Sequence, residues 1–408
     1  MLPPSLADWV ARQKQTLLAV TQHLTSFPHW LESRWLPLGV FALALLACLP
    51  WLRPLPTPRF AVAAPLTAVP LHHPASLERD RLPNPTASAH SVSLANLEPG
   101  RIGAAWFAGS REGAPDVQIF FSAYDGHNWS EPQAIVTRPK MEQDTGRLVR
   151  KLGNPVLWND GDGNLHLWFV SVSYGGWAGS ALNHTVSHDG GQTWSKVQRL
   201  VTSPFWNIST LVRNPPLPLA DGSLALPVYH EFIAKRPEWL RMTANGSRSQ
   251  VLDKQRIVAG KRSLQPAVAV LNSQQALMLL RDASGAHRIR QSRSEDGGTH
   301  WSPVSATELP NPDAGIALLR LADGRLLLAY NPQEANRTQL ALSLSADEGQ
   351  SWSGPYLVEN GSGQDEFSYP ALLQDERGIV HLAYTWKREH IAHLSFHPDW
   401  LRQLRGMP

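Results

Sequence analysis

The segment Ser294-Glu295-Asp296-Gly297-Gly298-Thr299-His300-Trp301 recurs along this chain. Its Ser, Asp, Gly and Trp, at offsets 0, 2, 4 and 7, return in residues 187–194 and 345–352. A degraded copy over residues 122–129 keeps the Ser, Gly and Trp but moves the Asp by one position. We predict that each copy closes a hairpin turn, because the Asp accepts hydrogen bonds from turn amides, the Gly adopts a positive φ and the Trp packs under the turn. Repetition of such a box indicates a repeat fold.

A second pattern, a turn followed by an apolar strand, occurs six times at intervals of roughly 50 to 63 residues. Its turns begin at Pro99, Asp162, Asp221, Asn272, Asp323 and Arg377. A period of about 40 to 60 residues with several strands in each unit is typical of a β-propeller. A β-sandwich with Asp-Gly hairpins is the alternative, but sandwiches do not repeat at this period. We therefore predict an all-β fold, a six-bladed β-propeller over residues 85–400.

The composition agrees with a turn-rich β protein and argues against some classes of partner and site. The 408 residues include 16 Trp, 33 Pro and 29 Gly, and only 17% are charged. A net charge of +3 without a basic run argues against a nucleic-acid partner. The single cysteine, Cys48, excludes an internal disulfide framework and a cysteine-based metal site. We expect neither a metal ion nor a cofactor.

The N-terminal part contains an apolar stretch, residues 35–52, that is bracketed by Arg34 and Arg53. Its length just reaches that of a membrane-spanning helix. A retained anchor, a cleaved signal and a lipoprotein signal at Cys48 are the three alternatives, and all place the propeller outside the cytoplasm. We favour the anchor, with residues 1–34 in the cytoplasm and the Pro- and Ala-rich residues 53–84 as a linker.

Polar residues that recur once in each blade are the candidate site, because the innermost strands and loops of a propeller converge on its channel. The set consists of His90, Arg111, Asp116, Asn154, Asn214, Gln265, Arg281, Arg337 and Tyr369. Converging arginines predict a carboxylate or sulfate ligand, since a guanidinium binds such anions bidentately. A Tyr and an Asp would supply a nucleophile or base and an acid. Surface ion pairs for the arginines, core packing for Tyr369 and a structural role for His90 are the alternatives.

The boxes, the six repeats and this polar set together resemble the sialidase superfamily over residues 85–396. Residues 106–116 resemble the first-blade segment of that family, which carries an Arg (Arg111) and, five residues later, the acid Asp (Asp116). Arg281 and Arg337 match the second and third members of an arginine triad, and Tyr369 matches the nucleophile. The resemblance implies that the triad binds the carboxylate of the sugar, that the Tyr attacks the anomeric carbon and that the Asp protonates the leaving oxygen.

Two positions differ from the family pattern. His90 stands where the first arginine of the triad is expected, and Gln265 replaces the carboxylate that activates the Tyr. A glutamine cannot accept a proton from a phenol with a pKa of about 10. Glu366 could do so only if its loop folds back toward Tyr369.

Three functions follow from these observations. The first is a sialidase-like exo-glycosidase that acts on a carboxylated terminal sugar of a glycan or polysaccharide. The second is a uronic-acid polysaccharide lyase, in which His90 and Tyr369 act as base and acid while Gln265 and the arginines neutralise the carboxylate. The third is a non-catalytic propeller that binds acidic glycans.

Overall fold

The computed structural model describes residues 36–48, 57–62, 77–203, 207–245 and 248–403, which divide into two compact units at Pro56 and Thr57. In the first unit, helix α2 (Leu36–Cys48) has 13 residues. At 1.5 Å per residue it measures about 20 Å, whereas a bilayer core is about 30 Å thick. No helix among the described residues is long and apolar enough to cross a membrane. The predicted transmembrane segment thus gains no support; residues 1–35 and 49–52 lie outside the described residues.

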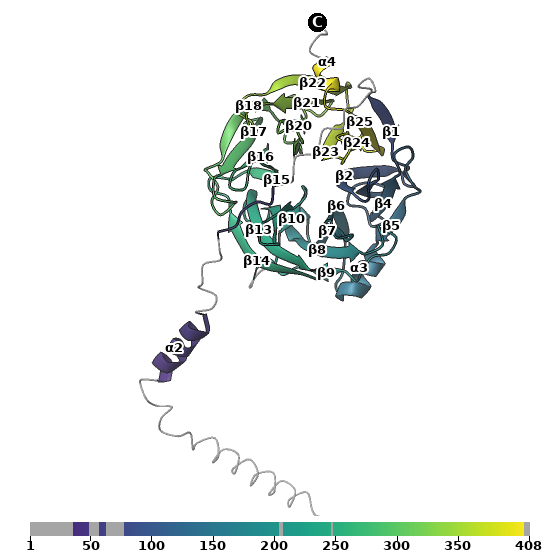
Figure 1. Ribbon diagram of the computed structural model, residues 1–408. Helices are drawn as coiled ribbons and strands as arrows, with labels where there is room; N and C mark the ends of the chain where they lie inside the picture. Colours follow the sequence, from purple (N-terminus) through teal and green to yellow (C-terminus); the bar gives the residue numbers. More distant parts are fainter. Residues whose placement is uncertain (1–35, 49–56, 63–76, 204–206, 246–247, 404–408) are drawn as a thin grey trace, which may run out of the picture. The chain divides into compact units, whose positions relative to one another are not determined.

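Residues 77–203, 207–245 and 248–403 form six antiparallel sheets arranged around a ring (Figure 1). The first blade contains β2 (Ser88–Asn96), β3 (Ile102–Gly109), β4 (Gln118–Tyr124) and β5 (Gln133–Val136), and the second contains β6 (Lys151–Asn159), β7 (Leu165–Val172), β8 (Ser180–Ser187) and β9 (Gln198–Arg199). The third blade contains β10 (Leu211–Val212), β11 (Leu217–Pro218), β12 (Leu224–His230), β13 (Arg236–Asn245) and β14 (Arg248–Arg256), and the fourth contains β15 (Ser263–Val270), β16 (Ala276–Asp282), β17 (Arg288–Ser294) and β18 (Ser305–Pro310). The fifth blade contains β19 (Ala317–Arg320), β20 (Leu326–Tyr330), β21 (Gln339–Ser345) and β22 (Ser353–Asn360), and the sixth contains β23 (Phe367–Gln374), β24 (Val380–Trp386), β25 (His390–Phe396) and β1 (Glu78–Arg81). The predicted six-bladed propeller is confirmed.

The apolar strand that follows each repeated turn is the second strand of its blade, namely β3, β7, β12, β16, β20 and β24. These strands are buried on both faces, because apolar clusters fill the spaces between neighbouring blades. In β16, Leu277 and Leu279 pack toward the fifth blade, whereas Met278 and Leu280 pack toward the third. Burial of both faces explains why each of these strands reads as a continuous apolar run.

The recurring box lies on the outer turns β8–β9, β17–β18 and β21–β22, as predicted. In the first copy, Ser187 Oγ donates to Asp189 Oδ1 at 2.7 Å, and the amide of Thr193 donates to the same oxygen at 2.8 Å. The amide of Gly191, with a φ of 96°, donates to Ser187 Oγ at 2.8 Å. The indole of Trp194 donates to the Gly191 carbonyl at 3.0 Å, which packs the ring under the turn.

Two segments of the predicted linker 53–84 belong to the propeller. Strand β1 pairs with β25 and completes the sixth blade, so a strand from before the first blade closes the ring. Phe60 is buried between the third and fourth blades, and its amide donates to the Ser273 carbonyl at 2.9 Å. The expected boundary at residue 85 therefore falls after the closing strand.

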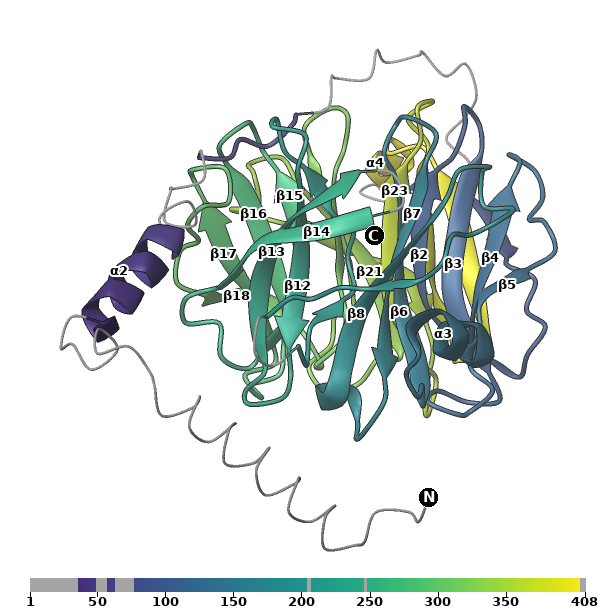
Figure 2. The same ribbon diagram turned by 90° about the horizontal axis from the view of Figure 1, so that it is seen from below.

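Figure 2 shows the ring edge-on, with strands running between two faces at which the connecting loops gather. In the described part of the propeller, three short helices lie outside the sheets: α3 (Arg138–Thr145), the 3-10 helix η3 (Trp177–Gly179) and α4 (Trp400–Gln403). The innermost strands are β2, β6, β10, β15, β19 and β23. They surround the central channel, and it is on these strands that the candidate site is built.

Candidate functional site

Four of the innermost strands described here carry the same backbone irregularity. Ser91 in β2, Asn154 in β6, Gln265 in β15 and Tyr369 in β23 have φ values of 56°, 47°, 51° and 52°. The pairing with the second strand of the blade shifts register around each of them. A non-glycine residue in this conformation costs about 1 kcal/mol or more, and such residues cluster at functional sites. Because a bulge also redirects a side chain, these positions mark one level of the channel as the candidate site.

Arg281 joins three of the polar groups at this level. Its Nη1 donates to Tyr369 Oη at 3.1 Å and to Gln265 Oε1 at 3.2 Å, and its Nε donates to Asp313 Oδ1 at 2.6 Å. Burial alone would lower the pKa of Arg281, but its contacts with the Tyr369 hydroxyl and the Asp313 carboxylate raise it, so the guanidinium remains charged. The structure thus brings together Gln265, Arg281 and Tyr369 from the predicted set.

Tyr229, which the sequence analysis did not select, extends this network into the third blade. Its hydroxyl accepts hydrogen bonds from Asn154 Nδ2 at 3.0 Å and from Gln265 Nε2 at 3.4 Å. Burial raises the pKa of Tyr229, which therefore stays neutral. Since both amides donate to this oxygen, the Tyr229 O–H proton is left to point elsewhere.

Arg337 lies beside the Tyr369 ring and is paired with Glu366. Arg337 Nη1 donates to Glu366 Oε1 at 3.1 Å, and its Cζ lies 5.9 Å from the centroid of the Tyr369 ring. Arg388 binds the same carboxylate, through Nε to Oε2 at 2.7 Å and through Nη2 to Oε1 at 3.3 Å. Burial alone would raise the pKa of Glu366, but hydrogen bonds from Arg388 and Ser368 lower it to about 2. Glu366 is therefore a counter-ion for two arginines and is too weak a base to activate Tyr369.

His90, in place of the first triad arginine, is buried and uncharged. Its side chain is 3% exposed, and its ring centroid lies 4.5 Å from that of Tyr369. Burial lowers the pKa of His90 to about 3, and the nearby charge of Arg388 acts in the same direction. Neither ring nitrogen has a hydrogen-bond partner among the described side chains and backbone. His90 therefore supplies an apolar face to Tyr369 and no positive charge at neutral pH.

Arg213 and Asn214 tie the blades together beneath Tyr369. Arg213 Nη2 donates to the carbonyls of Tyr369 and Pro370 at 2.8 Å, and its Nη1 donates to the carbonyl of Val92 at 3.2 Å. Asn214 Nδ2 donates to the carbonyl of Pro266 at 2.8 Å. Burial lowers the pKa of Arg213 to about 10. These bonds cross the channel and hold the bulges in place, which gives Asn214 a structural role.

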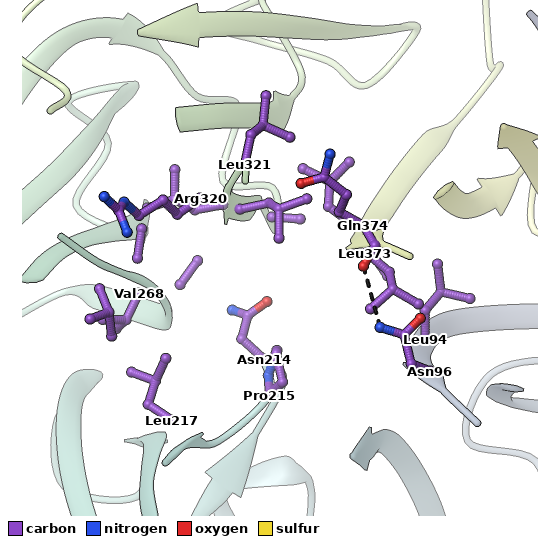
Figure 3. A pocket seen from close by; sticks show the side chains of 18 of the residues that line it. Leu94, Asn96, Asn214, Pro215, Leu217, Val268, Arg320, Leu321, Leu373 and Gln374 are labelled. Carbon is purple, nitrogen blue, oxygen red and sulfur yellow. Dashed lines mark hydrogen bonds between the residues drawn. The ribbon is translucent and has the colours of Figure 1, made fainter. Parts of the chain in front are cut away.

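A cavity of about 620 Å³ occupies the next part of the channel (Figure 3). Its walls come from the parts of the innermost strands that follow the bulges, and Arg213 and Asn214 contribute to its lining. The walls are mostly aliphatic, with Leu94, Val268 and Leu373 among them, and Tyr369 and Arg281 are not among its lining residues. The Arg213 and Asn214 bonds therefore separate this apolar cavity from the arginine cluster.

The first-blade residues predicted for the site, Arg111 and Asp116, lie in the exposed β3–β4 loop. Asp116 accepts hydrogen bonds at 2.9 Å from the amide and from Oγ of Ser110. These bonds, led by the one from the hydroxyl, lower the pKa of Asp116. In the part of the chain that the structure describes, no hydrogen bond or ion pair joins either residue to Tyr369, Arg281 or Arg337.

Glu231, at the end of β12, is a carboxyl group near the site that the sequence analysis did not select. Burial raises the pKa of Glu231 while the charges of Lys235 and Arg281 lower it, and the charge of Glu231 in turn contributes to the raised pKa of Tyr229. A carboxyl group with a raised pKa is a better proton donor near neutral pH than one with a lowered pKa. Throughout the described ranges, no group of three or more His, Cys, Asp and Glu side chains is arranged to hold a metal ion.

Comparisons with solved structures show the same fold. The Hadza microbial sialidase Hz136 has a TM-score of 0.63 at 16% identity, with 77% of this chain and 66% of that chain covered. The NanB sialidase from Streptococcus pneumoniae has a TM-score of 0.62 at 13% identity, with 81% and 72% covered. The intramolecular trans-sialidase from Ruminococcus gnavus has a TM-score of 0.60 at 15% identity, with 78% and 96% covered. This chain thus spans just under two thirds of the Hz136 chain.

A search of curated proteins finds no match to this chain. The family model of the BNR repeat-like domain matches residues 100–382, which is more than half of the chain. That range begins before β3 and ends in β24, so it covers most of the ring. The chain therefore belongs to the BNR repeat-like domain family, within the sialidase-like superfamily of β-propellers.

Proposed function

We propose that this propeller is a glycosidase of the sialidase type that acts on a carboxylated terminal sugar. The observation that carries the proposal is the hydrogen bond of 3.1 Å from Arg281 Nη1 to Tyr369 Oη, with Arg337 beside the same ring. It joins a nucleophile to a cation at the level of the channel marked by the bulges. Guanidinium groups at this position favour a substrate with a carboxylate next to the reacting carbon.

In this mechanism Tyr369 Oη attacks the anomeric carbon, the glycosidic C–O bond breaks and the leaving oxygen takes a proton from an acid. A neutral phenol avoids the repulsion that a carboxylate nucleophile would meet from the carboxylate of the sugar. Arg281 stabilises the charge on Oη as the phenol proton passes to water. In the second step a water attacks the anomeric carbon and gives its proton to the carboxylate that acted as the acid, the bond to Tyr369 breaks, and Arg281 again stabilises the charge on Oη until water reprotonates it. Because Gln265 cannot accept that proton, we expect slow turnover.

The proton donor is Asp116 by family resemblance, but the electrostatics of the two carboxyl groups favour Glu231. Asp116 is exposed and its carboxylate is held ionised by Ser110. Glu231 has a pKa raised by burial and interacts with Arg281. We therefore propose Glu231 as the acid and retain Asp116 as the alternative.

The lyase alternative is favoured by one specific observation. No carboxylate among the described residues is hydrogen-bonded to Tyr369 Oη, and the His90 ring meets the Tyr369 ring edge-on with centroids 4.5 Å apart. β-Elimination needs a base, a proton donor and a neutralised substrate carboxylate, so Tyr369, Arg281 and Gln265 would serve it without a further carboxylate. His90, with its lowered pKa, is too weak a base for this role. This reaction forms an unsaturated uronate that absorbs in the ultraviolet, whereas hydrolysis does not.

Incubation of the full chain with acidic glycans tests the proposal. We expect slow release of methylumbelliferone from its glycosides of N-acetylneuraminic acid or a uronic acid, loss of release in Tyr369→Phe, and unchanged release in Tyr174→Phe. Tyr174 is a control because it is 72% exposed and, in the described part of the chain, no hydrogen bond or ion pair joins it to Tyr369, Arg281 or Arg337. An ultraviolet increase with acidic polysaccharides would establish the lyase instead. Binding of these glycans without any product would leave only the binding function.

We also propose that the apolar residues 35–52 direct the propeller out of the cytoplasm. The support is the uncharged sequence of that stretch. Protease treatment of intact cells that express the full chain should degrade or release the propeller. Its complete protection, with degradation after lysis, would contradict this location.

A further inference from the structure

We propose that Arg388 completes the cationic site with Arg281 and Arg337, in place of a charge that His90 cannot carry. The inference rests on the proposed function, because it concerns the recognition of a carboxylated sugar. It assigns a ligand-binding role to a residue outside the repeated boxes and outside the innermost strands.

The β24–β25 turn holds Arg388 over the mouth of the channel. Lys387 and Arg388 have φ values of 50° and 59°, and they are the central residues of a β-turn that the Glu389 amide closes by donating to the Trp386 carbonyl at 2.9 Å. The amide of Lys387 donates to the Glu366 carbonyl at 2.7 Å, and the carbonyl of Arg388 accepts from the Ala89 amide at 3.1 Å. The turn is therefore fastened to β23 on one side and to β2 on the other, next to Tyr369 and His90.

The Arg388 side chain then reaches the carboxylate that Arg337 already binds. Both guanidinium groups donate to Glu366 Oε1, at 3.1 Å from Arg337 and 3.3 Å from Arg388. A second carboxylate, that of Glu112, accepts from Arg388 Nη1 at 2.8 Å. Since one oxygen is shared, the two arginines are held as neighbours beside Tyr369, three residues after Glu366 in the chain.

Arg388 retains capacity for a ligand. A guanidinium has five N–H groups, and the bonds to Glu366 and Glu112 use three of them. The side chain is 42% exposed, whereas that of His90 is 3% exposed. A carboxylated sugar that enters the mouth would therefore meet Arg388 before His90. Bidentate recognition of a carboxylate suits arginine more than any other side chain.

The test compares the binding of N-acetylneuraminic acid with that of its methyl ester, which lacks the charge. In the full chain we expect the acid to bind at least tenfold more tightly. Arg388→Met should lose about tenfold to a hundredfold in affinity for the acid with little change for the ester, as expected for a charge-assisted hydrogen bond. Arg388→Lys keeps the charge beside both carboxylates and should lose less. Arg377→Met is the control, because Arg377 pairs with Asp375 on the β23–β24 turn.

The outcomes separate the two proposals. If Arg281→Met abolishes the preference for the acid while Arg388→Met and Arg388→Lys leave it unchanged, the site stands and the role of Arg388 is overturned. If the unmodified chain does not distinguish the acid from the ester, the proposed function fails and the role of Arg388 fails with it. Thermal unfolding of each variant checks that it is folded. Should Arg388→Met unfold, Arg388→Lys decides the question by its expected partial loss.

Discussion

Replacement of Gln265 by glutamate would restore a base to the proposed site. Gln265 is 3% exposed, and its Oε1 accepts from the same Arg281 nitrogen that donates to Tyr369 Oη. A methyl group built on Gly315 would lie 3.1 Å from Gln265 Oε1 and 3.6 Å from Tyr369 Cδ1, so both side chains face this glycine. A carboxylate at position 265 would therefore stand beside the phenol and form an ion pair with Arg281.

Gln265→Glu should change both the stability of the fold and the rate of the reaction. The substitution removes the hydrogen bond of 3.4 Å from Gln265 Nε2 to the Tyr229 hydroxyl. Tyr229 can compensate by donating its proton to the new carboxylate, because Asn154 still donates to it at 3.0 Å. We therefore expect the free energy of unfolding to change by no more than about 1 to 2 kcal/mol. A positioned general base accelerates a reaction about 10²- to 10⁴-fold, which lowers the barrier by about 3 to 5 kcal/mol.

The assay is the initial rate of methylumbelliferone release from the acidic glycosides, with thermal unfolding measured in parallel. Gln265→Met, which removes both hydrogen bonds at similar volume, should not gain activity. Gln255→Glu, on outer strand β14, controls for the added negative charge. A folded Gln265→Glu protein with an unchanged or lower rate would refute the reasoning. A loss of affinity for acidic sugars would favour a site built for elimination or for binding alone.

Three further predictions concern the acid, the pH dependence and the boxes. Glu231→Gln should lower turnover at least a hundredfold and Asp116→Asn less than tenfold, and the reverse order in rate assays would return the acid role to the first-blade loop. Burial lowers the pKa of His184 to about 3. Below about pH 6.5 this histidine is therefore protonated in the unfolded chain but not in the folded chain, so the free energy of unfolding should fall as the pH drops. Between pH 7 and pH 5, the free energy of unfolding measured in urea should fall by about 2 kcal/mol less in His184→Gln than in the unmodified chain. An equal fall in the two proteins would contradict this prediction. Gly349→Ala should lower the free energy of unfolding, measured by urea titration, by about 1 to 3 kcal/mol more than Gly222→Ala. The two glycines have similar φ values, 84° and 80°, but only at residue 349 would an added Cβ lie 2.4 Å from a leucine of β16. Equal losses for the two glycines would show that the outer turn is not tightly packed.

The number of blades is determined by the sequence alone, because the signals that encode it are local. Each box is closed by hydrogen bonds that stay within one turn, such as those from Ser187 and Thr193 to Asp189. The six apolar second strands are equally visible, because burial between blades removes polar residues from both of their faces. Gln265, Arg281 and Tyr369 could also be selected, because family resemblance and the proline after Gln265 and Tyr369 mark them.

The rest of the site depends on contacts between distant parts of the chain. Tyr229 and Arg213 reach the site from the third blade and Arg388 from the last hairpin. Arg213 directly precedes Asn214, which the sequence did select, but nothing near Tyr229 or Arg388 in the sequence distinguishes them from other polar residues. The pairing of Glu366 with two arginines, which prevents it from acting as a base, depends on the β24–β25 turn and on Arg337.

The strand that closes the ring could not be predicted from the sequence, because it is defined by a long-range pairing. Strand β1 is four charged residues, Glu78–Arg81, that pair with β25 across more than 300 positions of sequence. Its backbone satisfies the edge of the sixth blade, and its side chains are exposed, so it has no apolar pattern by which to be recognised. The turns and the strands buried on both faces can be predicted from the sequence, because their signals are local. The pairing of distant strands and the contacts between charged residues of different blades depend on the tertiary structure.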